Sequence, residues 1–353
     1  YIGRGKVAEL REYIHLTGAT GIVCDDELTP SQMNNLEREL DTKIMDRTMV
    51  ILDIFASRAS TKEGKIQVEL AQLRYRATHL IGMGSILSRQ GGGIGTRGPG
   101  EKQLEIDRRV IRERISKLKA ELEQVKINRT TQRKRRMDQG VPVVCIVGYT
   151  NAGKSTLLNR LTDSQVLSED KLFATLDPTT RSLVLEDGQQ ILLTDTVGFI
   201  RKLPHHLIQA FRSTLEEAKY ADDILHVVDA SNPQMDIQMH TVYETLRELE
   251  IGNKPILTAF NKVDREGVPE VLKDFHADET YRISARTGQG LDELLTGIGR
   301  RIRESRVYLE HVYPYNEAAK IALIRKRGQV IEEEYREDGI YIRAYVDRRG
   351  NYV

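Results

Sequence analysis

The feature that most constrains the fold is the stretch "GYTNAGKST", Gly148 to Thr156, which fits the pattern G-x-x-x-x-G-K-[ST]. An apolar run, "VPVVCIVG", precedes it and a helical stretch follows. In such a strand–loop–helix setting, backbone N–H groups and the start of the helix can surround phosphate oxygens. Lys154 can place a charge on the β- and γ-phosphates, and the Ser155 hydroxyl can bind Mg²⁺.

Strand-like and helix-like segments alternate from about residue 141 to residue 304. This alternation predicts an α/β fold, a mostly parallel sheet with helices on both faces. The segment "LEDGQQILL" carries an Asp187-Gly188 turn and predicts one hairpin within the sheet. Cys145 lies in the apolar run before the loop and is expected to be buried in a strand.

The segment "FNKVD", Phe260 to Asp264, predicts which base is bound. The Asp264 carboxylate can accept two N–H bonds from guanine, whereas adenine offers neither donor and would leave the carboxylate unpaired. Asn261 can tie this loop to the phosphate loop, and the stem of Lys262 can lie along the ring. The segment "ISA", which ends at Ala285, can direct a backbone N–H to the guanine carbonyl.

Two further segments lie between these motifs. In "LLTDTVGF", Asp195 ends a strand where it can support Mg²⁺, and the Gly198 N–H can reach the γ-phosphate. Phe199 stands where many switch GTPases place a glutamine that orients water. The segment "LFATLDPTTR" occupies the place of a metal-sensing loop, and three of its residues have a hydroxyl that could bind Mg²⁺: Thr175, Thr179 and Thr180.

The rest of the chain predicts three more parts. Residues 1–60 suggest a small α/β unit with a strand near residue 22, a helix capped by Thr29 or Ser31, and a strand over residues 48–59. Residues 61–140 contain two heptad seams separated by "GGGIGTRGPG", which predicts an antiparallel helical hairpin with a glycine-rich tip. Residues 141–304 form the nucleotide-binding domain, and residues 305–353 a small α+β domain of strand, helix and hairpin.

The second helix of the hairpin is basic. From Glu101 to Arg136 there are 13 Lys and Arg against 6 Asp and Glu, a difference of +7, and the run ends in "RKRR", Arg133 to Arg136. A solvated helix face would explain the charge, but a net excess of this size beside an arginine-bearing tip favours an RNA-facing arm.

Composition sets outer limits. The chain has 353 residues, two cysteines and a net charge of +1, so a nucleic-acid partner has to be argued from local patches. No apolar run reaches the ~20 residues of a membrane span, and neither a signal peptide nor a disulfide framework is expected. These features predict a cytoplasmic protein, and self-pairing of the two seams predicts a monomer. Because the chain opens at Tyr1, residues upstream are expected to be absent from it.

The motifs resemble those of translation-factor-related GTPases of the Obg and HflX type, and most closely the HflX family. The resemblance rests on "GYTNAGKST", "FATLDPTTR", "DTVGFI", "NKVD" and, before the nucleotide domain, "GGGIGTRGPGEKQLEIDRR". It covers nearly the whole chain. It implies that Thr175 is the threonine that binds Mg²⁺, with Ser155 and Asp195, and that Lys154, Thr175 and Gly198 act in hydrolysis. It also suggests K⁺ beside Asn151, against a simple loop-shaping role for that residue.

The full set of expected nucleotide contacts is Gly148, Tyr149, Thr150, Asn151, Ala152, Gly153, Lys154, Ser155, Thr156, Phe173, Ala174, Thr175, Leu176, Asp177, Asp195, Thr196, Val197, Gly198, Asn261, Lys262, Val263, Asp264, Ser284 and Ala285.

The resemblance further implies GTP hydrolysis coupled to the large (50S) ribosomal subunit and its 23S rRNA, with separation of stalled or idle 70S ribosomes, notably after heat stress. Phe199 has no hydrogen-bonding group, so hydrolysis to GDP and phosphate should be slow until the subunit docks. Two alternatives stay open: a checkpoint in large-subunit assembly, and a GTP switch that recruits a protein through its hairpin.

Overall fold

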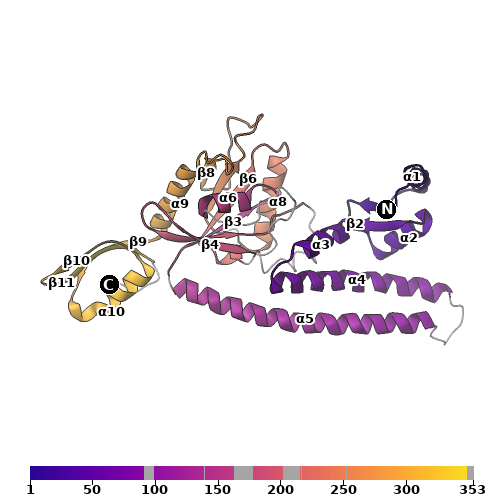
Figure 1. Ribbon diagram of the computed structural model, residues 1–353, viewed down its shortest axis with the longest axis horizontal. Helices are drawn as coiled ribbons and strands as arrows, with labels where there is room; N and C mark the ends of the chain where they lie inside the picture. Colours follow the sequence, from indigo (N-terminus) through magenta and orange to yellow (C-terminus); the bar gives the residue numbers. More distant parts are fainter. Residues whose placement is uncertain are drawn as a thin grey trace. The chain divides into compact units, whose positions relative to one another are not determined.

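The computed structural model describes residues 1–90, 99–138, 140–162, 178–201, 215, 217–251 and 253–347. The chain divides into two compact units, one built on Tyr1–Lys126 and the other on Ile127–Arg201 and Arg212–Val353. Each unit is described by itself. Figure 1 labels the helices and strands of both.

The first unit begins with a small α/β layer. Its parallel strands are β1 (Gly21–Cys24) and β2 (Lys43–Asp46), and its helices are α1 (Arg4–Thr17), α2 (Pro30–Leu40) and α3 (Arg47–Arg58). Of the two residues expected to cap α2, Thr29 does so: its hydroxyl accepts from the Gln32 N–H, and the Gln32 side chain accepts from the Thr29 N–H. This reciprocal capping fixes where α2 begins.

The expectation of a strand over residues 48–59 is wrong, because this segment forms most of helix α3. The Asp46 carboxylate accepts a hydrogen bond of 2.8 Å from the Met49 N–H and so caps the helix. Ile51, Leu52 and Phe55 are buried along one face. The run of apolar and β-branched residues resembles a strand. A run this short fits the period of a strand and the period of a helix equally well, so the sequence pattern does not distinguish them.

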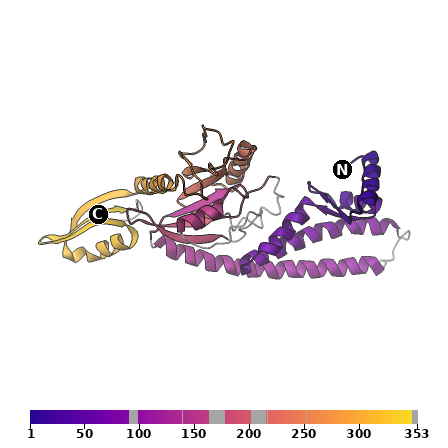
Figure 2. The ribbon, with the colours of Figure 1, turned by 45° about the horizontal axis from the view of Figure 1, so that its top comes forward.

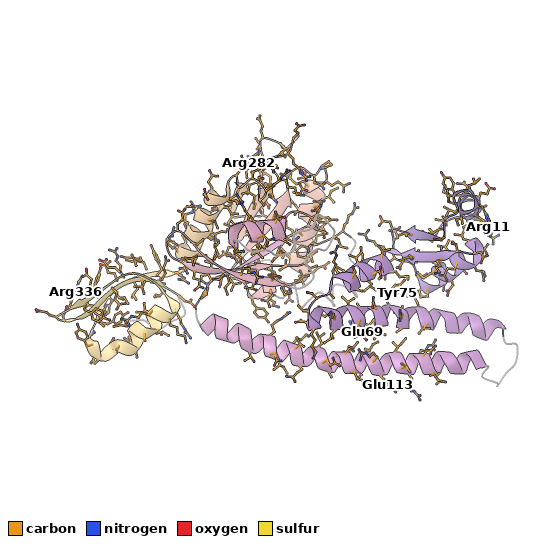
Figure 3. All side chains as sticks on the ribbon, in the orientation of Figure 1. Arg11, Glu69, Tyr75, Glu113, Arg282 and Arg336 are labelled. Atoms are coloured by element: carbon orange, nitrogen blue, oxygen red, sulfur yellow. The ribbon has the colours of Figure 1, made fainter. Side chains whose placement is uncertain are left out.

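Helices α4 (Lys62–Gln90) and α5 (Pro99–Asp138) form the expected hairpin, in which they run side by side and antiparallel (Figures 1 and 2). Its seam contains residues from both predicted heptad patterns: Ile66, Leu70, Leu73, Ile115, Leu118 and Leu122. Across the same pair of helices, the Arg114 guanidinium donates to both oxygens of Glu69, at 2.7 and 2.9 Å (Glu69 is labelled in Figure 3). The glycine-rich tip, residues 91–98, lies outside the described residues.

The second unit contains a mixed six-stranded sheet of order β4-β5-β3-β6-β7-β8. The strands are β3 (Val143–Gly148), β4 (Thr179–Val184), β5 (Gln190–Asp195), β6 (Asp223–Asp229), β7 (Ile256–Asn261) and β8 (Glu279–Arg282), and the helices are α6 (Lys154–Thr162), α8 (Met235–Glu248) and α9 (Leu291–Ser305). Only the β4–β5 hairpin is antiparallel. This confirms the mostly parallel sheet.

Helices cover both faces of this sheet. Val227 packs in the core that contains the leucines of α6 and α9, whereas its neighbour Val228 packs against Met239 of α8. Successive side chains of a strand point to opposite faces. Cys145 is fully buried in β3, as its apolar surroundings predicted.

The last part of the second unit is a three-stranded antiparallel sheet of order β10-β11-β9, with helix α10 packed on it. Its elements are β9 (Val307–Tyr313), the 3₁₀ turn η1 (Tyr315–Glu317), α10 (Ala318–Arg327), β10 (Gln329–Arg336) and β11 (Gly339–Val346). Strand, helix and hairpin therefore follow in the predicted order.

Candidate guanine-nucleotide site

Four parallel strands end at polar or glycine residues, and three of these ends carry the sequence motifs. Strand β3 ends at Gly148, β5 at Asp195, β6 at Asp229 and β7 at Asn261. Parallel strands place these ends at one edge of the sheet, where ligands of open α/β folds bind.

The phosphate loop that follows β3 contains residues with positive φ angles, a backbone conformation that glycine adopts readily. Gly148, Asn151 and Gly153 all have positive φ angles, of 153°, 64° and 99°. A Cβ at Gly148 would overlap the Val227 carbonyl, and one at Gly153 would overlap the Asn261 amide. The loop leads into α6, which starts at Lys154, so the N-terminal amides of this helix face the loop.

Lys154 is buried, with 6% of its surface exposed, and its Nζ donates to the Tyr149 carbonyl at 3.0 Å. Burial lowers the pKa of Lys154 to about 8, although the nearby Asp195 carboxylate acts in the opposite direction. A phosphate placed in the loop would favour the charged ammonium and raise this pKa.

Ser155 and Asp195 lie together at the start of α6. The Ser155 Oγ donates to Asp195 Oδ2 at 2.7 Å, and Asp195 is fully buried. Hydroxyl and carboxylate oxygens are the hard ligands that Mg²⁺ takes, usually in small number beside water and phosphate. Across the described residues, no group of three or more His, Cys, Asp or Glu could hold a metal.

Of the three candidate threonines, Thr175 lies outside the described residues, as do Phe173, Ala174, Leu176 and Asp177. Thr179 and Thr180 belong to β4, and the Thr180 hydroxyl is hydrogen-bonded to the Thr194 hydroxyl at 3.0 Å.

The segment after β5 runs beside the phosphate loop like an extra strand. The Phe199 N–H donates to the Gly148 carbonyl at 3.1 Å, and the Thr150 N–H and hydroxyl donate to the Phe199 carbonyl at 2.8 and 2.9 Å. Gly198 is closely packed, since a Cβ there would lie 2.7 Å from the Thr150 Cα and 2.9 Å from the Lys154 Nζ. The Phe199 side chain is buried, with 4% of its surface exposed.

Asn261 connects three segments. Its Nδ2 donates to the Ala152 carbonyl of the phosphate loop, and its Oδ1 accepts from the Ala285 N–H, both at 2.9 Å. The sequence analysis expected a backbone N–H of the segment Ile283–Ala285 to reach the guanine carbonyl, and of these the Ala285 N–H is hydrogen-bonded to Asn261. Asn261 is 2% exposed, so these bonds hold the base loop against the phosphate loop within a dry interior.

Asp264 is exposed at the end of the same loop. Its Oδ1 accepts from the Ser284 hydroxyl at 2.7 Å, and this bond is the main cause of a lowered Asp264 pKa. The carboxylate is therefore ionised near neutral pH, the form that accepts hydrogen bonds on both oxygens. The loop beyond it is fixed at its far end, because Arg282 donates to the carbonyls of Pro269 and Glu270 (Arg282 is labelled in Figure 3).

The sequence reasoning missed two polar residues at the end of β6, Asp229 and Ser231. Asp229 Oδ2 lies 2.7 Å from the Lys262 Nζ, and Asp229 Oδ1 accepts from the Ser231 N–H and hydroxyl. A signal was present in "VVDAS", a carboxylate at the end of a buried strand of the same sheet.

The phosphate loop, the N-K-x-D segment tethered to it and the Asp195–Gly198 segment beside it define a P-loop GTPase. Residues 143–262 match the family described as 50S ribosome-binding GTPase, residues 58–136 match the GTP-binding GTPase middle region, and residues 1–56 match its N-terminal region.

GTPase HflX of Lacrimispora saccharolytica is 66% identical over 346 residues, which cover 98% of this chain and 82% of that protein. GTPase HflX of Caldanaerobacter subterraneus is 50% identical, over 98% of this chain and 80% of that protein. The Escherichia coli K12 protein of the same name is 45% identical, over 86% and 72%. The chain belongs to the HflX family of GTPases, as its motifs suggested.

A solved GTP-binding protein from the archaeon Sulfolobus solfataricus, in complex with GDP, is 27% identical and aligns over 85% of both chains with a TM-score of 0.46. The family assignment rests on the sequence relatives. Within the part of the chain that the structure describes, no helix is both long and apolar enough to cross a membrane.

Proposed function

We propose that this GTPase docks on the large ribosomal subunit through 23S rRNA and separates stalled or idle 70S ribosomes, with heat stress as the condition that most requires it. The supporting observation is that a tethered guanine-nucleotide site and a helix with a net charge of +7 occur in one chain. Positive charge along a helix favours the phosphate backbone of RNA. The match of residues 143–262 to the 50S ribosome-binding GTPase family supports the same partner.

Within this proposal the chain has four parts, residues 1–60, 61–140, 141–304 and 305–353. The hairpin is the arm that faces RNA. GTP orders the loops around its γ-phosphate and so biases the arrangement of arm and nucleotide domain. The protein acts as a monomer in the cytoplasm.

The nucleotide contacts we propose are those predicted from the sequence. Residues Gly148–Thr156 surround the phosphates, Asn261–Asp264 with Ser284 and Ala285 hold the base, and Ser155, Asp195 and Thr175 support Mg²⁺. The 2.7 Å contact between Ser155 and Asp195 supports the first two metal ligands. A K⁺ ion beside Asn151 is a further element, which a comparison of turnover in K⁺ and in Na⁺ tests.

Hydrolysis by the protein alone is proposed to be slow. The buried Phe199 carries no group that could orient water, and catalysis of phosphoryl transfer depends almost entirely on positioning and charge. Docking on the 50S subunit reshapes the two loops and completes the site. A steady-state GTPase assay with and without 50S subunits tests this step, and equal rates would contradict it.

Sedimentation of 70S ribosomes distinguishes the functions. With this protein and a non-hydrolysable GTP analogue, free 30S and 50S subunits should increase, and the corresponding ATP analogue should have no effect. An assembly checkpoint would instead bind 50S subunits and leave 70S ribosomes intact. Recruitment of a protein through the hairpin would be insensitive to neutralising the basic run Arg133–Arg136.

A further inference from the structure

The carboxylate at the end of β6 is held in one orientation by its own turn. Asp229 Oδ1 accepts from the Ser231 N–H at 3.1 Å and from the Ser231 hydroxyl at 2.6 Å. Asp229 is also paired in register with Asn261 of β7, and the Ala230 N–H donates to the Asn261 carbonyl at 2.9 Å. The Oδ2 oxygen is thereby directed toward the residue that follows Asn261.

That residue is Lys262, whose ammonium lies between two acceptors. Its Nζ is 2.7 Å from Asp229 Oδ2 and 2.8 Å from the Asn151 carbonyl of the phosphate loop. The two charged side chains are only 12% (Asp229) and 15% (Lys262) exposed. Lys262 itself has a φ of 67°, in the left-handed region that residues other than glycine seldom adopt.

We propose that Asp229 is a positioning residue for guanine-nucleotide binding, which holds the Lys262 stem across the face of the base. The inference rests on the proposed base site at Asn261–Asp264. A lysine side chain is flexible, and fixing its ammonium at both acceptors in advance removes the loss of rotamer freedom that binding would otherwise incur. Of the two acceptors of the Lys262 ammonium, the Asn151 carbonyl is neutral. Asp229 supplies the negative charge that pairs with the ammonium.

A purely structural role is the competing explanation. A buried ion pair is weak evidence for stability, because desolvation offsets much of the attraction between the charges. The geometry instead directs both Asp229 oxygens to groups at the nucleotide edge of the sheet, Ser231 and Lys262. A positioning role predicts a change in nucleotide affinity that depends on the lysine charge, which a loss of stability would not produce.

The test is a double-mutant cycle on GDP affinity, measured with a fluorescent GDP analogue. Asp229→Asn keeps the size of the side chain and removes its charge, and we expect about tenfold weaker GDP binding. At saturating GTP, with 50S subunits present, kcat should stay within about twofold, because the change affects binding of ground and transition state alike. Asp236→Asn, at an exposed position on α8, is the matched control and should leave GDP binding unchanged.

Lys262→Met keeps an aliphatic stem but removes the ammonium. In this background Asp229→Asn should produce no further loss, and equal losses in both backgrounds would overturn the proposal. Thermal unfolding without nucleotide accompanies each variant. Should Asp229→Asn fail to fold, Ser231→Ala serves in its place: it removes the hydroxyl donor to Asp229 Oδ1 and leaves the backbone N–H donor. Its smaller loss of GDP affinity must also vanish beside Lys262→Met.

The unaltered protein separates this inference from the function on which it rests. A preference for GDP over ADP together with no coupling between residues 229 and 262 refutes the positioning role alone. Absence of any such preference refutes the guanine site itself.

Discussion

Replacing Gly198 by alanine tests the phosphate end of the site. The added Cβ would lie 2.7 Å from the Thr150 Cα, 2.8 Å from the Thr150 Oγ1 and 2.9 Å from the Lys154 Nζ. Non-bonded carbon atoms prefer separations of about 3.5–4.0 Å, so either the Gly198 segment or the phosphate loop has to move by roughly 1 Å. The Thr150 contact is with backbone and cannot be relieved by rotating a side chain.

A displacement of this size should act mainly on hydrolysis. Misplacing reacting groups by about 1 Å can cost on the order of 10²-fold in rate, which corresponds to roughly 2.7 kcal/mol of transition-state stabilisation. GDP has no γ-phosphate to meet Gly198, so its affinity should change by no more than about fivefold.

The assay is steady-state GTP hydrolysis with saturating 50S subunits, beside a GDP titration. Gly5→Ala is the matched control, since a Cβ at this position in α1 meets nothing within 4 Å. A Gly198→Ala protein whose kcat stays within about threefold of the unaltered protein would refute the reasoning from distance.

Four other outcomes are expected. Asp264→Asn should weaken GDP binding by on the order of 10²-fold, because two charge-assisted bonds are lost, and should move preference toward xanthine nucleotides in competition binding. Since the Lys154 pKa is about 8 before phosphate binds, the free ammonium loses its proton above that pH, and titrations from pH 7 to pH 10 should show GDP affinity falling as pH rises, toward about tenfold per pH unit. Leu118→Ala, at a position 1% exposed in the hairpin seam, should lower the free energy of unfolding by about 2–4 kcal/mol in denaturant titrations, whereas Ile106→Ala, at a side chain 45% exposed, should change it little. Neutralising Arg133–Arg136 should weaken ribosome binding and reduce the slope of log K against log salt by about 3, from four lost phosphate contacts.

Much of this fold could be predicted because its signals are local. The phosphate loop has a fixed spacing between a buried strand and a helix, and the hairpin seam repeats every three or four residues, so each can be read without knowing its partners. The cap of α2 could be narrowed to Thr29 or Ser31 for the same reason, since capping depends on neighbouring residues, and the structure selects Thr29.

The predictions failed where a contact joins residues that are distant in the sequence, or where an apolar pattern fits both the helix period and the strand period. Residues 48–59 have apolar content that suits either a strand or a helix, and the Asp46 cap decides between them. The contact between Asp229 and Lys262 joins residues 33 positions apart, and only the pairing of β6 with β7 brings them together. The use of the Ala285 N–H by Asn261 likewise depends on tertiary placement.

The three hydrogen bonds between the Phe199 backbone and the phosphate loop, two with loop backbone and one with the Thr150 hydroxyl, have a mechanical consequence. A force applied at Arg201 would reach the phosphate loop through these bonds, and part of it would pass on to Asn261, which is bonded to the Ala152 carbonyl of that loop. Under the proposed function, a large partner that pulls on this part of the chain would displace the segment beside the γ-phosphate before it displaces the base loop, which lies one hydrogen-bonded step further away.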